Sequence, residues 1–183
     1  MSIRQKLSRL RPAQHRLLIM TLTAMMTALY FILDRFLSFY PVSSIKIGFN
    51  FLPVAAAAVW LGPIPAAIVG GLGDLLGSLL IPAGAPIPML TVTAAAEGLV
   101  LGLLLYEKVG CERSWRSRWV RLAIGLLIAA LLHVVVNTWS LAVVFSPDAV
   151  LPWMVAKIPM RALKEGIMLV IQPFVYALLM KLA

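Results

Sequence analysis

The sequence predicts an all-α membrane protein, a bundle of six transmembrane helices, and three observations support this fold class. First, 62% of the 183 residues are hydrophobic and 13% are charged, whereas a soluble domain carries about 25% charged residues. Second, the apolar residues fall into long runs, and the mean hydropathy is +0.97. Third, these runs lack the alternation of a barrel strand, so the helix is the structure that satisfies their backbone polar groups in lipid.

Six apolar runs have roughly the length needed to cross about 30 Å of hydrocarbon. Most are separated by Gly and Pro, as at Gly62-Pro63, and the one clearly polar connection is 111–118. Strands are not expected. The chain is expected to form a single integral membrane domain over 1–183, with spans near 17–34, 47–62, 64–80, 90–106, 119–143 and 156–181.

The basic residues predict how the bundle is oriented, because cytoplasmic loops are enriched in Lys and Arg. If the N-terminus is cytoplasmic, the inner side holds most of the 16 basic residues, namely Arg4, Lys6, Arg9, Arg11, Arg16, Lys108, Arg113, Arg116, Arg118, Arg121 and Lys181. The outer side then holds Arg35, Lys46, Lys157, Arg161 and Lys164. Both termini are therefore expected inside, and the net charge of +9 reflects orientation rather than a groove for nucleic acid.

Most polar side chains within the predicted spans fall in the outer half of the bundle. At 1.5 Å per residue, Asp74 lies about 9 Å below the outer end of its span, and Glu97 lies about 10 Å into the next. Ionisable groups in lipid are costly and usually mark a substrate or ion path. The sequence therefore predicts a polar cavity open to the outside. Its expected lining is Arg35, Lys46, Asn50, Asp74, Glu97, His133, Asn137, Arg161 and Lys164.

Several of the polar residues in the spans also have a purely structural interpretation. Asp74 could pair with a buried cation, and His133 and Asn137 could hydrogen-bond between helices. Lys157 and Arg161 could extend towards the lipid headgroups. The shared depth across five spans favours a pocket, because independent structural roles would scatter over both leaflets.

Small residues recur at helical spacing in three spans. Gly70, Gly73 and Gly77 follow one face of the third span, and Gly98 and Gly102 repeat the pattern in the fourth. Small residues let helix backbones approach closely in lipid. In the first span, Ala24 and Ala28 form a similar pair. That pair indicates either packing within the bundle or a docking face for another membrane subunit.

The sequence lacks the motifs of several function classes. There is no G-x-x-x-x-G-K-[ST] loop for ATP and no H-E-x-x-H or other paired metal-ligand spacing. The single cysteine, Cys111, excludes an internal disulfide and a cysteine-based metal cage. Two other classes of function stay open. One is a small secondary transporter that uses Asp74 and Glu97 as proton relays, and the other is a membrane-embedded enzyme or structural subunit.

Several segments resemble one known family, the substrate-binding S components of energy-coupling factor (ECF) vitamin importers, and most of all its folate-specific group. The resemblance runs from about residue 17 to the end of the chain, and it rests on the order and spacing of KIGFNFLP at 46–53, LGP at 61–63, GGLGDLLG at 70–77, VNTW at 136–139 and RALKEGIMLVIQP at 161–173. Two places depart from the family pattern: the connection 81–89, and Glu97, which stands where the family is often neutral.

The resemblance implies a non-enzymatic, six-helix bacterial membrane protein that captures a vitamin from outside the cell, with folate as the first choice of vitamin. Its implied partners are a membrane T subunit and two ATP-binding-cassette ATPases, and it implies no cofactor. Ala24 and Ala28 match the family's docking motif on the first span. Pantothenate, a queuosine precursor and riboflavin remain alternative ligands.

Overall fold

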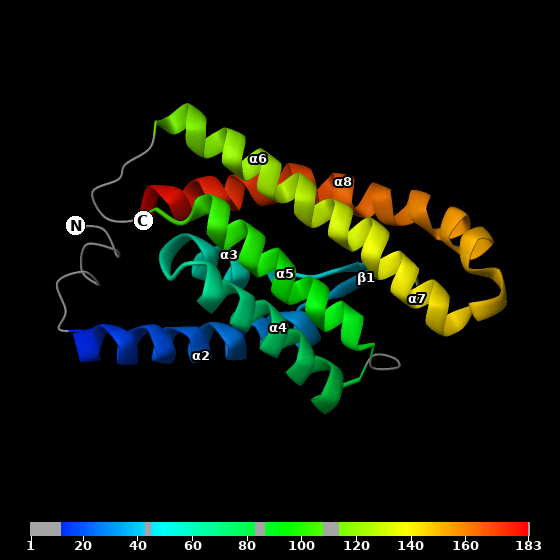
Figure 1. Cartoon of the computed structure of the whole chain (residues 1–183), viewed down its shortest axis with the longest axis horizontal. Helices are drawn as coiled ribbons and strands as arrows, with labels where there is room; N and C mark the ends of the chain where they lie inside the picture. Colours follow the sequence, from blue (N-terminus) through cyan, green and yellow to red (C-terminus); the bar gives the residue numbers. More distant parts are fainter. Residues whose placement is uncertain (1–11, 43–44, 83–86, 108–113, 183) are drawn as a thin grey trace.

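A computed structural model describes residues 12–42, 45–82, 87–107 and 114–182, with only the backbone described from 39 to 47. It confirms the all-helical fold class. The elements are α2 (Pro12–Phe36), β1 (Phe39–Val42), β2 (Ile45–Ile47), α3 (Phe51–Trp60), α4 (Pro63–Leu80), α5 (Pro88–Leu105), α6 (Trp115–Leu131), a π-helical turn (Leu132–Val136), α7 (Asn137–Phe145), a 3-10 turn (Pro147–Ala149) and α8 (Val150–Leu182). Helix α4, helix α5, the pair α6 and α7, and helix α8 run in alternating directions across the molecule, whereas α2 and α4 run in the same direction because α3 returns the chain between them (Figure 1).

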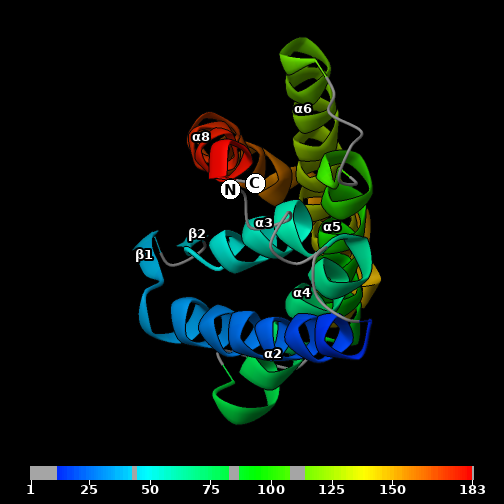
Figure 2. The ribbon, with the colours of Figure 1, turned by 90° about the vertical axis from the view of Figure 1, so that its left-hand side faces the viewer.

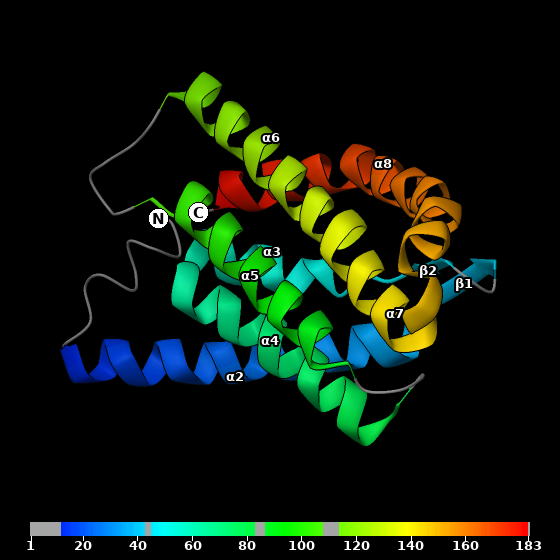
Figure 3. The same ribbon diagram turned by 45° about the vertical axis from the view of Figure 1, so that its right-hand side comes forward.

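Five helical segments are long and apolar enough to cross a membrane. They correspond to the predicted spans one, three, four, five and six. Their ends lie within a few residues of the predicted bounds, except that the last segment already begins at Pro147, before the predicted start at 156. Helices α6 and α7 form one rod through the π-helical turn between them (Figure 3). The first turns of α8 lie at an angle to the rest of that helix (Figures 1 and 3), which contains Pro159 and Pro173. Proline within a helix removes a hydrogen bond and bends it.

The second predicted span, 47–62, is wrong in length. Helix α3 has only 10 residues, so it is about 15 Å long, half the hydrocarbon thickness. It is also the most buried helix, with Ala55, Ala57, Ala58 and Val59 all 0% exposed. Figure 2 shows α3 between α2, α5 and α8. The run of small apolar residues therefore forms a short, buried central helix that returns the chain from the hairpin to the start of α4.

The expectation of no strands is also wrong, because the chain before α3 forms a short antiparallel hairpin. Strands β1 and β2 pair Phe39 with Ile47 and Val42 with Ile45. Aromatic and β-branched residues favour the extended conformation, and the hairpin includes Ile47, the first residue of the predicted second span. At its other end, α3 ends at Trp60, and the turn to α4 contains Gly62, whose φ of 108° is open to glycine and costly for other residues.

Helices α4 and α5 are in unusually close contact, as their glycines predicted. A Cβ added at Gly70 would overlap the backbone oxygen of Ala94, and one at Gly98 would overlap that of Ala66. Gly73 instead faces the ring of Tyr30 on α2. These contacts fix α2, α4 and α5 as one packed unit, and that unit forms one side of the site described next.

Candidate functional site

A polar cavity lies inside the bundle, close to the hairpin end of α2 and the start of α3. The space inside it that water-sized molecules can reach is about 120 Å³. Its walls come from α2, the turn before α3, α3 itself, α5, the π-helical turn and α8. The lining residues are Tyr30, Asp34, Gly48, Asn50, Phe51, Val54, Glu97, His133, Lys164, Glu165, Met168 and Gln172.

Glu97, His133 and Asn137 form a hydrogen-bonded chain on one side of the cavity. His133 Nε2 lies 2.9 Å from Glu97 Oε2, and Asn137 Nδ2 lies 3.0 Å from His133 Nδ1. The Glu97 side chain is 13% exposed. With this amide orientation, Asn137 donates to Nδ1 and the neutral imidazole donates from Nε2 to the carboxylate. The chain thus holds the Glu97 side chain in one orientation at the cavity wall.

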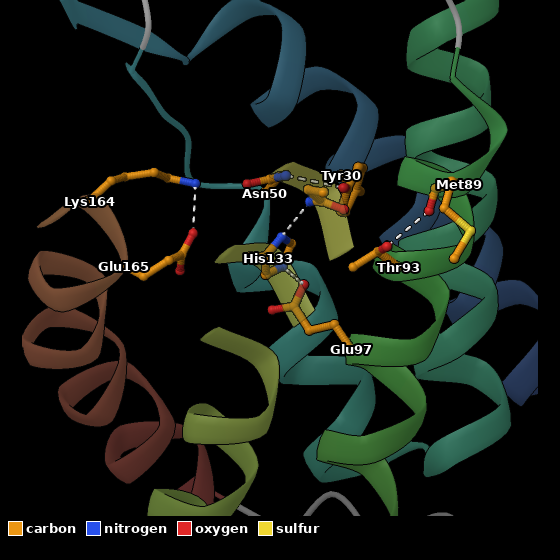
Figure 4. A network of polar contacts seen from close by, with 9 residues as sticks. Tyr30, Asn50, Met89, Thr93, Glu97, His133, Lys164 and Glu165 are labelled. Atoms are coloured by element: carbon orange, nitrogen blue, oxygen red, sulfur yellow. Dashed lines mark hydrogen bonds and ion pairs between the residues drawn. The ribbon is translucent and has the colours of Figure 1, made fainter. Parts of the chain in front are cut away.

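Helix α8 supplies a second charged pair at the opposite wall. Lys164 Nζ lies 3.0 Å from Glu165 Oε1, and both residues line the cavity. Figure 4 shows this pair on α8 facing the His133 and Glu97 side chains across the cavity. The cavity therefore contains an ammonium group on one wall and a carboxylate on the other, which suits a ligand with polar groups of both kinds.

Helix α2 and the turn before α3 close a third side. Asn50 Nδ2 donates to the Tyr30 hydroxyl at 3.1 Å. Asp34, one helical turn after Tyr30, lines the cavity and is 4% exposed. Tyr30 is held against α4 because its ring fills the space above Gly73. The packing of α2 on α4 thus sets the position of two lining residues.

Four of the nine residues predicted to bind substrate come together at the cavity: Asn50, Glu97, His133 and Lys164. Asn137 stands directly behind them as the partner of His133. The side chain of Lys46 lies outside the described part of the structure, although its backbone belongs to β2. The remaining three, Arg35, Asp74 and Arg161, are described and do not line this cavity.

Asp74 is the largest departure from the expected arrangement, because its depth in the third span predicted that it lines the cavity and it does not. It lies at the contact of α4 with α5 and accepts a hydrogen bond from Thr91 Oγ1 at 2.7 Å. Its partner is thus a hydroxyl rather than the buried cation of the alternative interpretation. Asp74 and Glu97 take part in separate hydrogen bonds, one with Thr91 and one with His133, so within the described part of the chain no hydrogen bond joins them into a proton relay.

Arg35 lies behind the cavity, on the α4 side. Its Nε is 3.2 Å from Asp34 Oδ2, and a Cβ added at Gly77 would be 2.7 Å from the same nitrogen. Arg161 lies one helical turn before Lys164 on α8 and is partly exposed. Both cations therefore flank the cavity without forming its wall.

Sequence reasoning missed Tyr30, Asp34, Glu165 and Gln172 as lining residues. A signal for the first two was present: Thr23, Thr27, Tyr30 and Asp34 recur at the spacing of one helical face, and all four are buried. Glu165 follows directly after Lys164 in an apolar span. Within the described residues, no group of three His, Cys, Asp or Glu side chains is placed to hold a metal ion.

A cavity lined by charged and polar side chains within a bundle of apolar helices is typical of a membrane protein that binds a small polar molecule. The sequence profile of the ECF-type riboflavin transporter S component matches residues 16–181. The chain therefore belongs to the family of ECF transporter S components, which are multi-pass bacterial membrane proteins that bind substrate and are not enzymes.

Two curated relatives agree with this assignment, and one solved structure shares the fold. The chain is 37% identical to the folate transporter FolT of Clostridium novyi (strain NT), over 66% of this chain and 66% of that protein. It is 28% identical to the folate transporter FolT of Leuconostoc mesenteroides, over 82% of this chain and 78% of that protein. A crystal structure of FolT bound with folic acid shares the fold, with a TM-score of 0.68 and 22% identity over 86% of this chain and 92% of that chain.

Proposed function

We propose that this chain is the folate-binding S component of an ECF importer. It captures folate from outside the cell and delivers it by associating with a T subunit and two ATP-binding-cassette ATPases. The family assignment supports substrate binding, and the names of the two curated relatives favour folate over riboflavin. The observation that carries the proposal is the cavity, where Glu97 on α5 faces Lys164 on α8.

The cavity matches the two ends of folate by charge. The pterin ring of folate offers neighbouring N–H donors, and its glutamyl tail carries two carboxylates. Carboxylates at the wall accept from the ring, and a cation binds the tail. We assign the ring to the wall that holds Glu97, His133 and Asn50. We assign the tail to Lys164, with Arg161 one turn nearer the start of α8.

The size of the cavity sets a condition on this proposal. A cavity of about 120 Å³ is smaller than the roughly 300–1,000 Å³ typical of pockets for drug-sized ligands. The ring system therefore occupies the enclosed part, and binding of the whole folate requires the mouth to widen. Gly48 and Asn50 precede α3 and line the cavity on that side, and we assign the widening to the turn that contains them.

Isothermal titration of the purified, detergent-solubilised chain with folate and with riboflavin tests the proposal. We expect one folate per chain with a dissociation constant below about 1 μM, which corresponds to about −8 kcal/mol. We expect riboflavin to bind at least about a hundredfold more weakly, a difference of about 2.8 kcal/mol. Riboflavin binding as tight as folate binding would refute the choice of vitamin. Absence of folate binding would refute the proposal itself.

A further inference from the structure

Glu97 is held by a chain of hydrogen bonds that runs back to the end of the π-helical turn. His133 lies within this turn, and Asn137 is the first residue of α7. π-Helical turns are rare and often occur at functional sites. Here the turn lies where the rod of α6 and α7 passes the cavity, and both ring nitrogens of His133 are engaged, one by Glu97 and one by Asn137.

The chain of contacts leaves one oxygen of Glu97 available. Oε2 is the atom beside His133. Among the described residues, no hydrogen bond reaches Oε1, and Glu97 lines the cavity. Figure 4 shows the second oxygen of this carboxylate pointing away from His133. An ionised carboxylate offers about four acceptor positions on its two oxygens, so Oε2 can accept a second hydrogen bond beside the one from His133.

We propose that Glu97 selects the ligand by the hydrogen-bond pattern of its ring edge, accepting two adjacent N–H groups with its two oxygens. A 2-amino-4-oxopyrimidine ring presents such an edge, through its ring N–H and its exocyclic amino group. His133 and Asn137 are positioning residues, because they fix the plane of the carboxylate without supplying acceptors for that edge. This inference rests on the proposed function, since it assumes that the cavity binds the ring of the ligand.

The same arrangement works against a flavin ring. The corresponding edge of an isoalloxazine carries one N–H between two carbonyl oxygens. Only one hydrogen bond to Glu97 can form, and a carbonyl oxygen then faces the second carboxylate oxygen. Sites built around hydrogen bonds reject ligands that lack the matching group by large factors, because the buried polar group of the site is left unpaired. Glu97 therefore favours a pterin over a flavin.

A pair of ligands and a pair of variants test the assignment directly. The ligands are folate and 2-desaminofolate, in which hydrogen replaces the exocyclic amino group. The variants are Glu97→Gln and the matched control Asp74→Asn, which makes the same chemical change in a neighbouring span, outside the cavity wall. Titration calorimetry of all four combinations, with wild type alongside, gives the coupling between the carboxylate and the amino group.

For wild type and Asp74→Asn, we expect 2-desaminofolate to bind at least about thirtyfold more weakly than folate. For Glu97→Gln, we expect this ratio to fall below about threefold, because the amide offers one acceptor in place of two. Equal binding of the two ligands to wild type would overturn the inference and leave the proposed function intact. Failure of wild type to bind folate would instead contradict the proposed function.

The positioning role of His133 needs a measurement that does not change when a substitution merely lowers the stability of the protein. The ratio of the two dissociation constants is such a readout. We expect His133→Leu to reduce the ratio to below about one third of its wild-type value, and His133→Gln, which keeps an N–H donor for Glu97, to retain most of it. An unchanged ratio in His133→Leu would show that Glu97 is oriented without His133.

Discussion

At the scale of single residues, glycines on α4 and α5 determine how closely the helices approach. A Cβ at Gly98 would overlap the backbone of Ala66, and a Cβ at Gly102 would overlap that of Pro63. Backbone atoms cannot rotate away as a side chain can, so the helices would have to separate. Glu97 precedes Gly98 directly, and this packing therefore also sets the position of the carboxylate at the cavity.

Replacing Gly98 with alanine should consequently destabilise the protein. We expect a loss of about 1–3 kcal/mol, the usual cost of overpacking a well-packed contact, and a lower midpoint of thermal unfolding in detergent. Gly166→Ala on α8 is the matched control, because nothing lies within 4 Å of a Cβ at that position. The control should be neutral or slightly stabilising, since alanine favours a helix more than glycine does. Similar midpoints for the two variants would contradict the close contact of α4 with α5.

The cations on α8 give a second prediction at this scale. We expect Lys164→Met to weaken folate binding by at least about tenfold, because a charge-assisted hydrogen bond to a carboxylate contributes about 1.5–3 kcal/mol. A pterin without the glutamyl tail should lose less than about threefold. Arg161→Met should show the same selectivity with a smaller effect, because Arg161 does not line the cavity. Calorimetry of both variants with both ligands provides the measurement, and equal losses for the two ligands would refute the assignment of the tail.

At the scale of elements, α2 has two faces with different environments. Thr23, Thr27, Tyr30 and Asp34 form its buried face. Ala24 and Ala28 lie on an exposed part of the helix surface, so they do not take part in the packing of the described bundle. This placement speaks against packing within the described bundle, and a docking face for the T subunit stays a prediction.

Replacing both alanines with leucine therefore tests docking separately from ligand binding. We expect uptake of folate by cells, and co-purification with the T subunit, to fall at least about tenfold, because bulky side chains prevent close approach of helices in lipid. The folate dissociation constant of the isolated chain should stay within about threefold. Ala156→Leu, at an exposed position on α8, is the control and should leave uptake unchanged. Loss of folate binding in the double variant would show that the pair supports the bundle instead.

The elements also show which parts of the fold the sequence could predict. The long spans were predictable, because lipid requires continuous apolar helices of defined length. The short α3 was not, because Ile45, Ile47 and Phe49 extend the apolar run before it, and a short apolar run does not distinguish strand from helix. The π-helical turn was not predictable either, because LHVVV at 132–136 continues the apolar pattern of the helices on either side.

The candidate site was predictable to a similar degree. A common depth in the membrane predicted that Asn50, Glu97, His133 and Lys164 lie near one another, and all four line the cavity. Depth alone does not show how a helix is rotated about its axis, and for this reason the prediction that Asp74 lines the cavity is wrong. It has the predicted depth, but its side of α4 faces Thr91 on α5. The direction of each side chain depends on which helices are neighbours, and that information lies in the packing.

At the scale of the whole molecule, the ends of the helices are distributed over two sides. The Pro12 end of α2 and the Leu182 end of α8 lie on the same side, together with the Leu105 end of α5 and the Trp115 end of α6 (Figures 1 and 3). Near that side, Arg118 binds Glu107 through two contacts, Nε to Oε1 at 3.1 Å and Nη2 to Oε2 at 2.8 Å. The hairpin and the connection from α7 to α8 lie on the opposite side.

This arrangement, together with the basic residues, predicts the orientation in the membrane. The side with the ends of α2, α5, α6 and α8 carries Arg16, Arg116, Arg118, Arg121 and Lys181, and cytoplasmic segments are enriched in such residues. The cavity, which lies near the hairpin, then opens towards the outside of the cell. The orientation and the direction of capture are thus a single hypothesis that one measurement can test.

Cys111 provides that measurement, because it is the only cysteine of the chain. It belongs to 108–113, outside the described residues, in the connection between α5 and α6. We expect Cys111 to resist a membrane-impermeant thiol reagent on intact cells and to react once the membrane is opened. The control is Cys111→Ser combined with Asp148→Cys, which places the thiol at an exposed position between α7 and α8; it should react on intact cells. The reverse pattern would invert the orientation, and the cavity would then open to the cytoplasm, which is incompatible with capture of folate from outside.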